Sequence, residues 1–175
     1  MIGLLLAAAL NCGSTATQVD LDFCAQAEQQ RADRDERATL AARPREASLT
    51  EGLWRDERRR TCAYYYDAYR DGSMAPMLYS QCLAHSAEAR TRDLRALRSG
   101  FPPGDGAKAI AEEQRVYGLL ELLLTPHQRS LLAGSETAWV RYRRILCRHS
   151  ANCNAQLAAF RTQELKDSWL AEPFW

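Results

Sequence analysis

The chain has 175 residues, a hydrophobic content of 46% and only 9 glycines and 6 prolines. A length of this order makes one domain or two small ones, and so few chain-breaking residues favour helices over a many-turned β-structure. The formal net charge is +1, from 23 basic and 22 acidic residues. Neither half of the chain is a polycation, so nucleic acid is not an expected partner.

An uninterrupted apolar run, IGLLLAAAL, occupies residues 2–10. It is too short to span a bilayer. It fits the hydrophobic region of a secretory signal, although the positively charged residues that usually precede that region are missing. We therefore predict a signal-like segment at residues 1–11 and no transmembrane segment. Six cysteines behind such a segment indicate an oxidising compartment, so we expect a periplasmic or secreted protein.

Helical periodicity and capping signals predict six helices along the rest of the chain. A capping box of Ser48 and Glu51 places the start of the second helix at Ser48. Thr125, Pro126 and Gln128 give the fifth helix an N-cap, a first-turn proline and a capping-box partner. The expected helices are 20–42, 48–70, 76–98, 107–124, 125–148 and 152–170.

One pattern, W-x3-R-x3-C followed by C-x7-R-T-x2-L, occurs twice. The first motif copy consists of Trp54, Arg58, Cys62, Cys82, Arg90, Thr91 and Leu94. The second motif copy consists of Trp139, Arg143, Cys147, Cys153, Arg161, Thr162 and Leu165. Because Trp and Cys are scarce, the joint match predicts a tandem repeat. The predicted fold is all-α, with about six helices in two three-helix units, each built on a disulfide-pinned helical hairpin. The units would span residues 12–98 and 107–175, joined by a linker at 99–106.

The repeated motif also favours particular cysteine pairs. Six cysteines allow 15 connectivities, and the two copies make one bridge within each copy the economical choice. These bridges are Cys62–Cys82 and Cys147–Cys153. A bridge between the remaining Cys12 and Cys24 would pin the N-terminal strand to the first helix.

Three alternatives to these disulfides remain open. Signal cleavage after Ala16 would remove Cys12 and leave Cys24 without a partner. Lipid attachment at Cys12 would anchor the chain to a membrane. His149 between the last two cysteines could complete a metal cluster, but the first motif copy has no equivalent histidine. No metal and no cofactor are predicted.

The spacing within each copy predicts a contact between tryptophan and arginine. Both the Trp-to-Cys and the Cys-to-Arg spacing are eight residues, about 12 Å along a helix. If a disulfide joins two antiparallel helices, Trp54 meets Arg90 and Trp139 meets Arg161. We expect a cation–π stack in each hairpin. Arg58 and Arg143, between bridge and tryptophan, would bond carbonyls or carboxylates.

The first hairpin should extend about two helical turns further past its bridge than the second, because its cysteines lie further apart. This extension is rich in tyrosine and methionine, which are favoured at adaptable contact surfaces. One interpretation is a partner-binding tip; the alternative is that these side chains pack on the chain's own helices. The candidate residues are Tyr65, Tyr66, Tyr69, Met74, Met77 and Tyr79.

No catalytic motif is visible in the sequence. Glycine-rich phosphate loops, G-x-S-x-G and H-E-x-x-H are all missing. The carboxylates are spread over the chain, so no acid–base pair stands out. The sequence therefore predicts a protein that is not an enzyme. A pocket in which polar groups with perturbed ionisation converge would favour the opposite.

Around these residues the chain resembles a known family. Trp54-x3-Arg58-x3-Cys62, the turn Gly72-Ser73-Met74 and the downstream cysteine are similar to the LprI-type lysozyme-inhibitor domains, which are small, secreted or periplasmic, bacterial and helical. The resemblance covers residues 12 to about 97, and residues 107–170 look like a degenerate second copy. Glu51 and Glu57 replace the glutamine and the aromatic residue that are usual in the family.

The resemblance implies a protein-binding function. The first hypothesis is a periplasmic or secreted domain that blocks a lysozyme-like glycosidase with its protruding hairpin. The second is an envelope structural or stress interaction module with another protein partner. Neither hypothesis predicts an oligomeric state.

Overall fold

The computed structural model describes residue 12 and residues 17–42 and 44–170. The expected signal-like segment, residues 1–11, lies outside them. Within the described part of the chain all regular structure is helical, which confirms the all-α prediction. The six helices are α1 (Gln18–Ala41), α2 (Pro44–Tyr69), α3 (Ala75–Ser99), α4 (Gly106–Leu123), α5 (Pro126–Leu146) and α6 (Ala151–Leu170). None of the described helices is long and apolar enough to cross a membrane.

Local signals set most helix ends. A capping box of Thr125 and Gln128 starts α5, as the sequence predicts. The prediction for α2 is wrong, because this helix begins at Pro44 and Ser48 lies inside it. Proline is well tolerated in a first helical turn, since its missing N–H has no intrahelical acceptor there. The pattern of Ser48 and Glu51 therefore does not mark the helix start.

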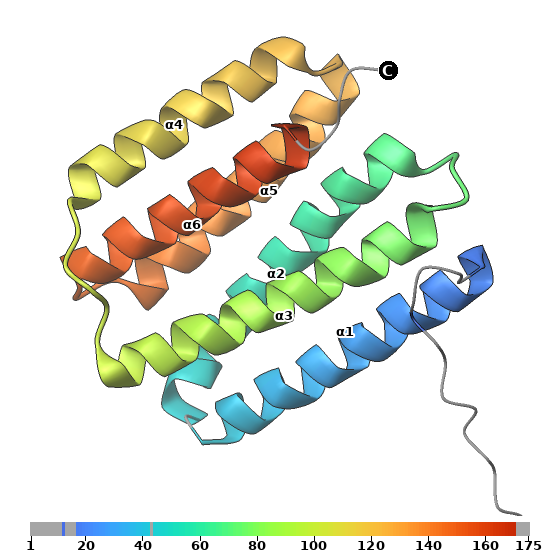
Figure 1. The fold of residues 1–175 in the computed structure, drawn as a ribbon. Coiled ribbons are helices and arrows are strands. Elements are labelled where there is room, and N and C mark those ends of the chain that lie inside the picture. The colour runs from blue at the N-terminus through green and yellow to red at the C-terminus, as the bar shows by residue number, and fades with distance from the viewer. Residues whose placement is uncertain (1–11, 13–16, 43, 171–175) are drawn as a thin grey trace, which may run out of the picture.

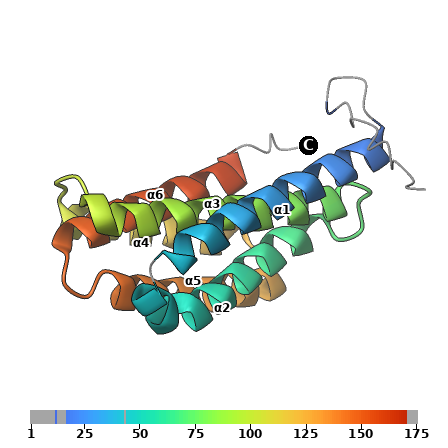
Figure 2. The same ribbon diagram turned by 90° about the horizontal axis from the view of Figure 1, so that it is seen from below.

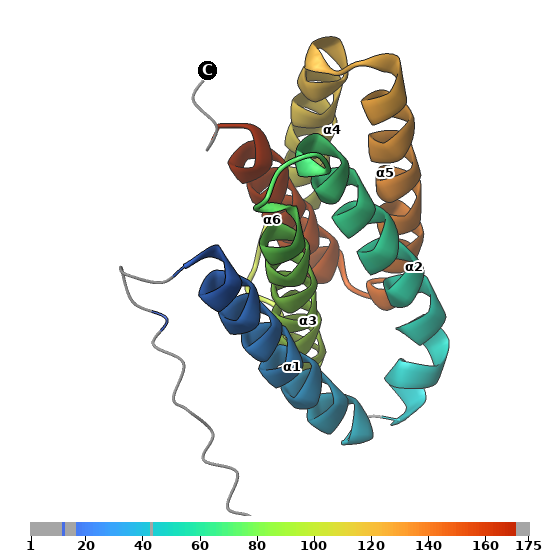
Figure 3. The ribbon, with the colours of Figure 1, turned by 90° about the vertical axis from the view of Figure 1, so that its right-hand side faces the viewer.

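The helices form two layers (Figures 1–3). One layer holds α1, α3, α6 and α4, in that order across Figure 1, and the other holds α2 and α5. Helix α1 packs on α3, and α4 packs on α6. Helices α2 and α5 run antiparallel and make the main contact between the first three helices and the last three.

The two predicted units share one hydrophobic core, because its clusters contain residues from both sides of the linker. One buried cluster joins Trp54 and Ala87 to Trp139, Tyr142 and other residues of α5 and α6. A second cluster places Tyr64 of α2 among apolar side chains of α4, α5 and α6. The two halves of the chain are thus packed together on shared apolar surfaces.

Three disulfides fasten the helices, and two of them join the pairs that the motif copies favour. Cys12 is bonded to Cys24, Cys62 to Cys82, and Cys147 to Cys153. The first hairpin continues from Cys62 to the end of α2 at Tyr69, whereas α5 ends directly before Cys147. As expected, only the first hairpin continues beyond its bridge for about two turns.

Candidate functional site

The tryptophan and arginine of each motif copy lie close together. The guanidinium carbon of Arg90 is 5.8 Å from the Trp54 ring centroid, and that of Arg161 is 5.6 Å from the Trp139 centroid. Both distances are within cation–π range, as the spacing predicts. All four side chains are buried, so these contacts belong to the interior of the protein.

The second arginine of each copy bonds to acceptors on neighbouring helices. Arg58 donates to the Asp33 carboxylate on α1 and to the Leu83 carbonyl on α3, both at 2.7 Å. Arg143 donates to the buried Glu113 carboxylate on α4, which also accepts 2.8 Å from the Trp139 indole N–H. These arginines therefore hold the first helix of each half against the motif helices.

The sequence analysis missed one hydroxyl residue in each motif copy, four positions before the tryptophan. Thr50 accepts a hydrogen bond of 2.6 Å from Arg90, and Ser135 accepts one of 2.8 Å from Arg161. The next residue is a glutamate in both copies: Glu51 lies 4.0 Å from Arg90, and Glu136 lies 3.4 Å from Arg161. The signal was present as a repeated [ST]-E-x-x-W.

Other contacts cross from one half of the chain to the other. Tyr142, directly before Arg143, accepts from Arg90 at 3.0 Å and donates to Asp93 at 3.1 Å. Glu57, directly before Arg58, lies 4.0 Å from Arg161. The residue preceding the middle arginine of each copy thus reaches the last arginine of the other copy.

The α2–α5 interface adds a direct hydrogen bond between hydroxyls. Thr61 and Ser135 are 2.6 Å apart and both are buried. Thr61 also donates to Glu57 at 2.7 Å. A polar network therefore runs through the middle of the protein, where each hydrogen bond is shielded from water.

Burial changes the ionisation of this network. It raises the pKa of Glu57 to about 7, although Arg161 acts in the opposite direction. It also raises the pKa of Asp93 to about 7, against the nearby charges of Arg92 and Arg90. Burial would lower the pKa of Arg161, but Glu136, Glu164 and Glu57 raise it. Near neutral pH the two buried acids are therefore close to half-protonated, whereas Arg161 stays charged.

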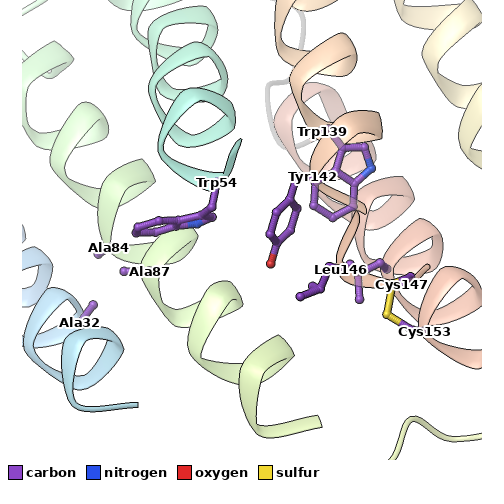
Figure 4. Packing of buried hydrophobic residues seen from close by; sticks show 10 residues of the cluster. Ala32, Trp54, Ala84, Ala87, Trp139, Tyr142, Leu146, Cys147 and Cys153 are labelled. Carbon is purple, nitrogen blue, oxygen red and sulfur yellow. A yellow bond between two sulfur atoms is a disulfide. The ribbon is translucent and has the colours of Figure 1, made fainter. Parts of the chain in front are cut away.

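A cavity of about 690 Å³ lies beside this network, between helices of both halves. Its walls are mostly apolar, and the charged groups of its lining include Glu57, Asp93, Glu164 and Arg90. Figure 4 shows Tyr142 between the two tryptophans that also line the cavity, Trp54 and Trp139. Polar groups with perturbed ionisation do converge in one pocket here, which the sequence did not predict.

The candidate partner-binding tip is divided by the fold. Met77 is buried, and Tyr65 and Tyr69 line the central cavity. These three side chains therefore face the interior of the protein, which agrees with the alternative interpretation that they pack on the chain's own helices. Tyr66 and Met74 are 39% and 49% exposed. Tyr79 is partly buried and packs edge-on against Tyr66, with ring centroids 5.6 Å apart. The accessible part of the tip is therefore Tyr66 and Met74.

The observed disulfides bear on two of the alternatives for the cysteines, a metal cluster at His149 and a lipid at Cys12. Cys147 and Cys153 share a disulfide, so neither offers a thiolate to a metal beside His149. The described residues contain no group of three or more His, Cys, Asp or Glu side chains that could hold a metal ion. The sulfur of Cys12 is bonded to Cys24, so a lipid thioether at that atom would require this bond to be open.

Comparison with known proteins found one similarity, in the first half of the chain. Residues 10–94 match the family model of lysozyme inhibitor LprI. The match includes the whole first motif copy and the α2–α3 hairpin, and it covers slightly less than half of the chain. The second motif copy lies outside the LprI match. Searches among curated proteins and solved structures found no match.

Proposed function

We propose that this protein binds a lysozyme-like muramidase and inhibits it, in the periplasm or outside the cell. The match of residues 10–94 to lysozyme inhibitor LprI carries the proposal. The three disulfides support an oxidising compartment. Within this proposal the protein is not itself an enzyme, and its partner is another protein.

The end of the α2–α3 hairpin is the contact surface that we propose. It lies inside the LprI match and has no equivalent in the α5–α6 hairpin. Tyr66 and Met74 offer exposed apolar area there, and the Arg70 side chain is 57% exposed. Lysozyme-like enzymes use two carboxylates in a cleft, so a protruding end suits such a cleft in shape.

In this proposal Glu57 and Asp93, the cavity carboxyls with raised pKa values, have a structural role. Perturbed acids often mark active sites. Here Asp93 accepts from Tyr142 of the other half, and Glu57 accepts from Thr61 and faces Arg161. The Asp93–Tyr142 and Glu57–Arg161 contacts join the two halves, so within this proposal the raised pKa values of these carboxyls follow from their burial in that interface.

An inhibition assay with two matched double variants tests the proposal. Purified protein in micromolar excess should slow cell-wall hydrolysis by at least one type of lysozyme. Replacing Tyr66 and Met74 by alanine should raise the inhibition constant at least tenfold, which corresponds to a loss of about 1.4 kcal/mol in binding free energy. The control replaces Leu119 and Leu123 of α4, which are 49% and 59% exposed, and should inhibit like the parent protein.

Two results would count against the proposal. If no lysozyme type is inhibited at micromolar excess, the muramidase is not the partner. A pull-down from envelope extract that enriches other envelope proteins would then favour the structural or stress module. If both double variants inhibit as the parent does, the hairpin end is not the contact surface.

A further inference from the structure

The central cavity has the dimensions of a small-molecule site. Its volume of about 690 Å³ lies within the usual range of roughly 300–1,000 Å³ for such sites. Its lining comes from α2, α3, α5 and α6 and from Leu124, so both halves of the chain are needed to form it. Most lining residues are buried or half-buried, and the exposed Gln81 and His85 mark where the cavity meets solvent on α3.

Aromatic side chains make up much of the wall. The six are Trp54, Tyr64, Tyr65, Tyr69, Trp139 and Tyr142. Aromatic faces attract cations, most strongly where water is excluded. Three of these rings already interact with a cation in the protein. The Arg90 guanidinium lies 5.8 Å from the centroid of Trp54 and 5.2 Å from that of Tyr142. The Arg161 guanidinium lies 5.6 Å from the centroid of Trp139.

The charged groups of the lining are predominantly acidic. The carboxyls are Glu57, Asp93 and Glu164, against the single guanidinium of Arg90. That guanidinium is already held by Thr50 and by the Tyr142 hydroxyl. Burial of a positive ligand beside these carboxyls is compensated, whereas a negative ligand would meet like charge in a medium that screens little.

We propose that this cavity binds an amphipathic organic cation, with an alkylammonium head among the aromatic rings and carboxyls and an apolar body along Leu78 and Ala89. The mostly apolar lining accounts for the body, and the aromatic and acidic groups account for the head. Tyr66 and Met74, the proposed contacts with lysozyme, are not among the residues that line this cavity, so the proposal does not depend on lysozyme binding.

Binding of the cation should depend on pH. The Glu57 carboxyl is surrounded by Thr61 on its own helix, Glu136 on α5, and Arg161 and Glu164 on α6. The Asp93 carboxyl is near Arg90 and Arg92 on α3, Tyr142 on α5 and Glu164 on α6. Burial raises the pKa of both carboxyls to about 7. A positive head favours their ionised forms, so affinity should rise between about pH 5.5 and pH 8.5.

Calorimetric titration with a charge series tests the site. The probes are decyltrimethylammonium and decyl sulfate, each below its critical micelle concentration, and decanol below its solubility limit, at about pH 8. The cation should bind one site per chain, about tenfold or more tighter than either of the other probes. Equal affinity for the alcohol, tighter binding of the sulfate or no binding of the cation would overturn the proposal.

Three variants locate the site. Asp93→Asn should weaken cation binding about tenfold and flatten its pH dependence, while Glu88→Gln on the exposed side of α3 should leave both unchanged. Ala89→Leu fills the cavity from α3 without changing charge and should abolish binding. Circular dichroism confirms that each variant is folded. Undiminished binding to folded Ala89→Leu would place the ligand elsewhere and overturn the proposal.

Discussion

Glu57 and Tyr142 occupy the same position of the two motif copies, and each contacts the last arginine of the other copy. Glu57 lies 4.0 Å from Arg161, and Tyr142 accepts 3.0 Å from Arg90. An acid and a phenol thus fill equivalent places in one interface. Only the phenol also donates, and its acceptor is Asp93 at 3.1 Å. These contacts join α2 to α6 and α5 to α3, so they fasten the two halves of the chain to each other.

The Tyr142 hydroxyl should contribute measurably to stability. Tyr142→Phe leaves the buried Arg90 and Asp93 without a shared partner, and an unsatisfied buried group costs about 1–3 kcal/mol. We expect a loss of this size in the free energy of unfolding, measured by urea denaturation at neutral pH. Tyr117→Phe is the control, because its hydroxyl bonds to the half-buried Glu121. Equal losses in the two variants would contradict the role of Tyr142.

Stability should decrease as the pH rises from about 5 to 8. The unfolded chain releases the protons of Glu57 and Asp93 near pH 4, but the folded protein holds them until about pH 7. Between these values the folded state binds more protons, so a rise in pH favours unfolding. Each group contributes a slope of up to about 1.4 kcal/mol per pH unit. Urea midpoints at pH 5 and pH 8 measure it.

Neutral replacements should flatten this pH dependence. In Glu57→Gln with Asp93→Asn, neither side chain titrates, so the difference between pH 5 and pH 8 should shrink. Burial also raises the pKa of Glu36 and Glu113, so a smaller slope of the same sign remains. An unchanged slope in the double variant would show that Glu57 and Asp93 ionise normally.

The two arginine–carboxylate pairs should differ in strength, because only the Arg143–Glu113 pair is fully buried. Glu113→Gln removes the charge that compensates buried Arg143 and should cost about 3–5 kcal/mol, as expected for a broken buried pair. Asp33→Asn should cost about 1 kcal/mol, because Arg58 and Asp33 are more accessible and Arg58 keeps the Leu83 carbonyl. Thermal unfolding of both variants gives the comparison, and a larger loss for Asp33→Asn would reverse this order.

The disulfides should stabilise according to the length of chain they close. Cys62 and Cys82 are separated by 20 residues, and Cys147 and Cys153 by 6. Chain entropy then predicts losses of about 3 and about 2 kcal/mol when each pair is replaced by alanine. Denaturant unfolding of the two double variants measures these losses. Intact mass before and after reduction should first show that three disulfides are present.

The local structure was largely predictable from the sequence. Trp54 and Arg90 could be brought together because helix geometry and one disulfide determine the distance between them. The capping residues Thr125 and Gln128 located the start of α5 for a similar reason, since capping depends on neighbours in the chain. The start of α2 was missed because Pro44 is accepted in a helical first turn.

The joining of the two halves was not predictable in the same way. Thr61 and Ser135 are 74 residues apart, and no pattern in either segment indicates that the two residues pair. Their hydroxyls and the acids around them also look like ordinary polar surface residues in a sequence. The central cavity follows from that pairing, so it could not be foreseen. Arg90 and Arg161 have similar surroundings, and the tandem repeat stays a prediction.

The short connection between α3 and α4, residues 100–105, has a consequence for the α2–α5 interface. Because it joins the two sides covalently, their association is an intramolecular event with a high effective concentration. Two separate chains with the same contacts would part on dilution. Here the interface, and the cavity it encloses, should persist at nanomolar protein, so the unfolding midpoint should be independent of protein concentration.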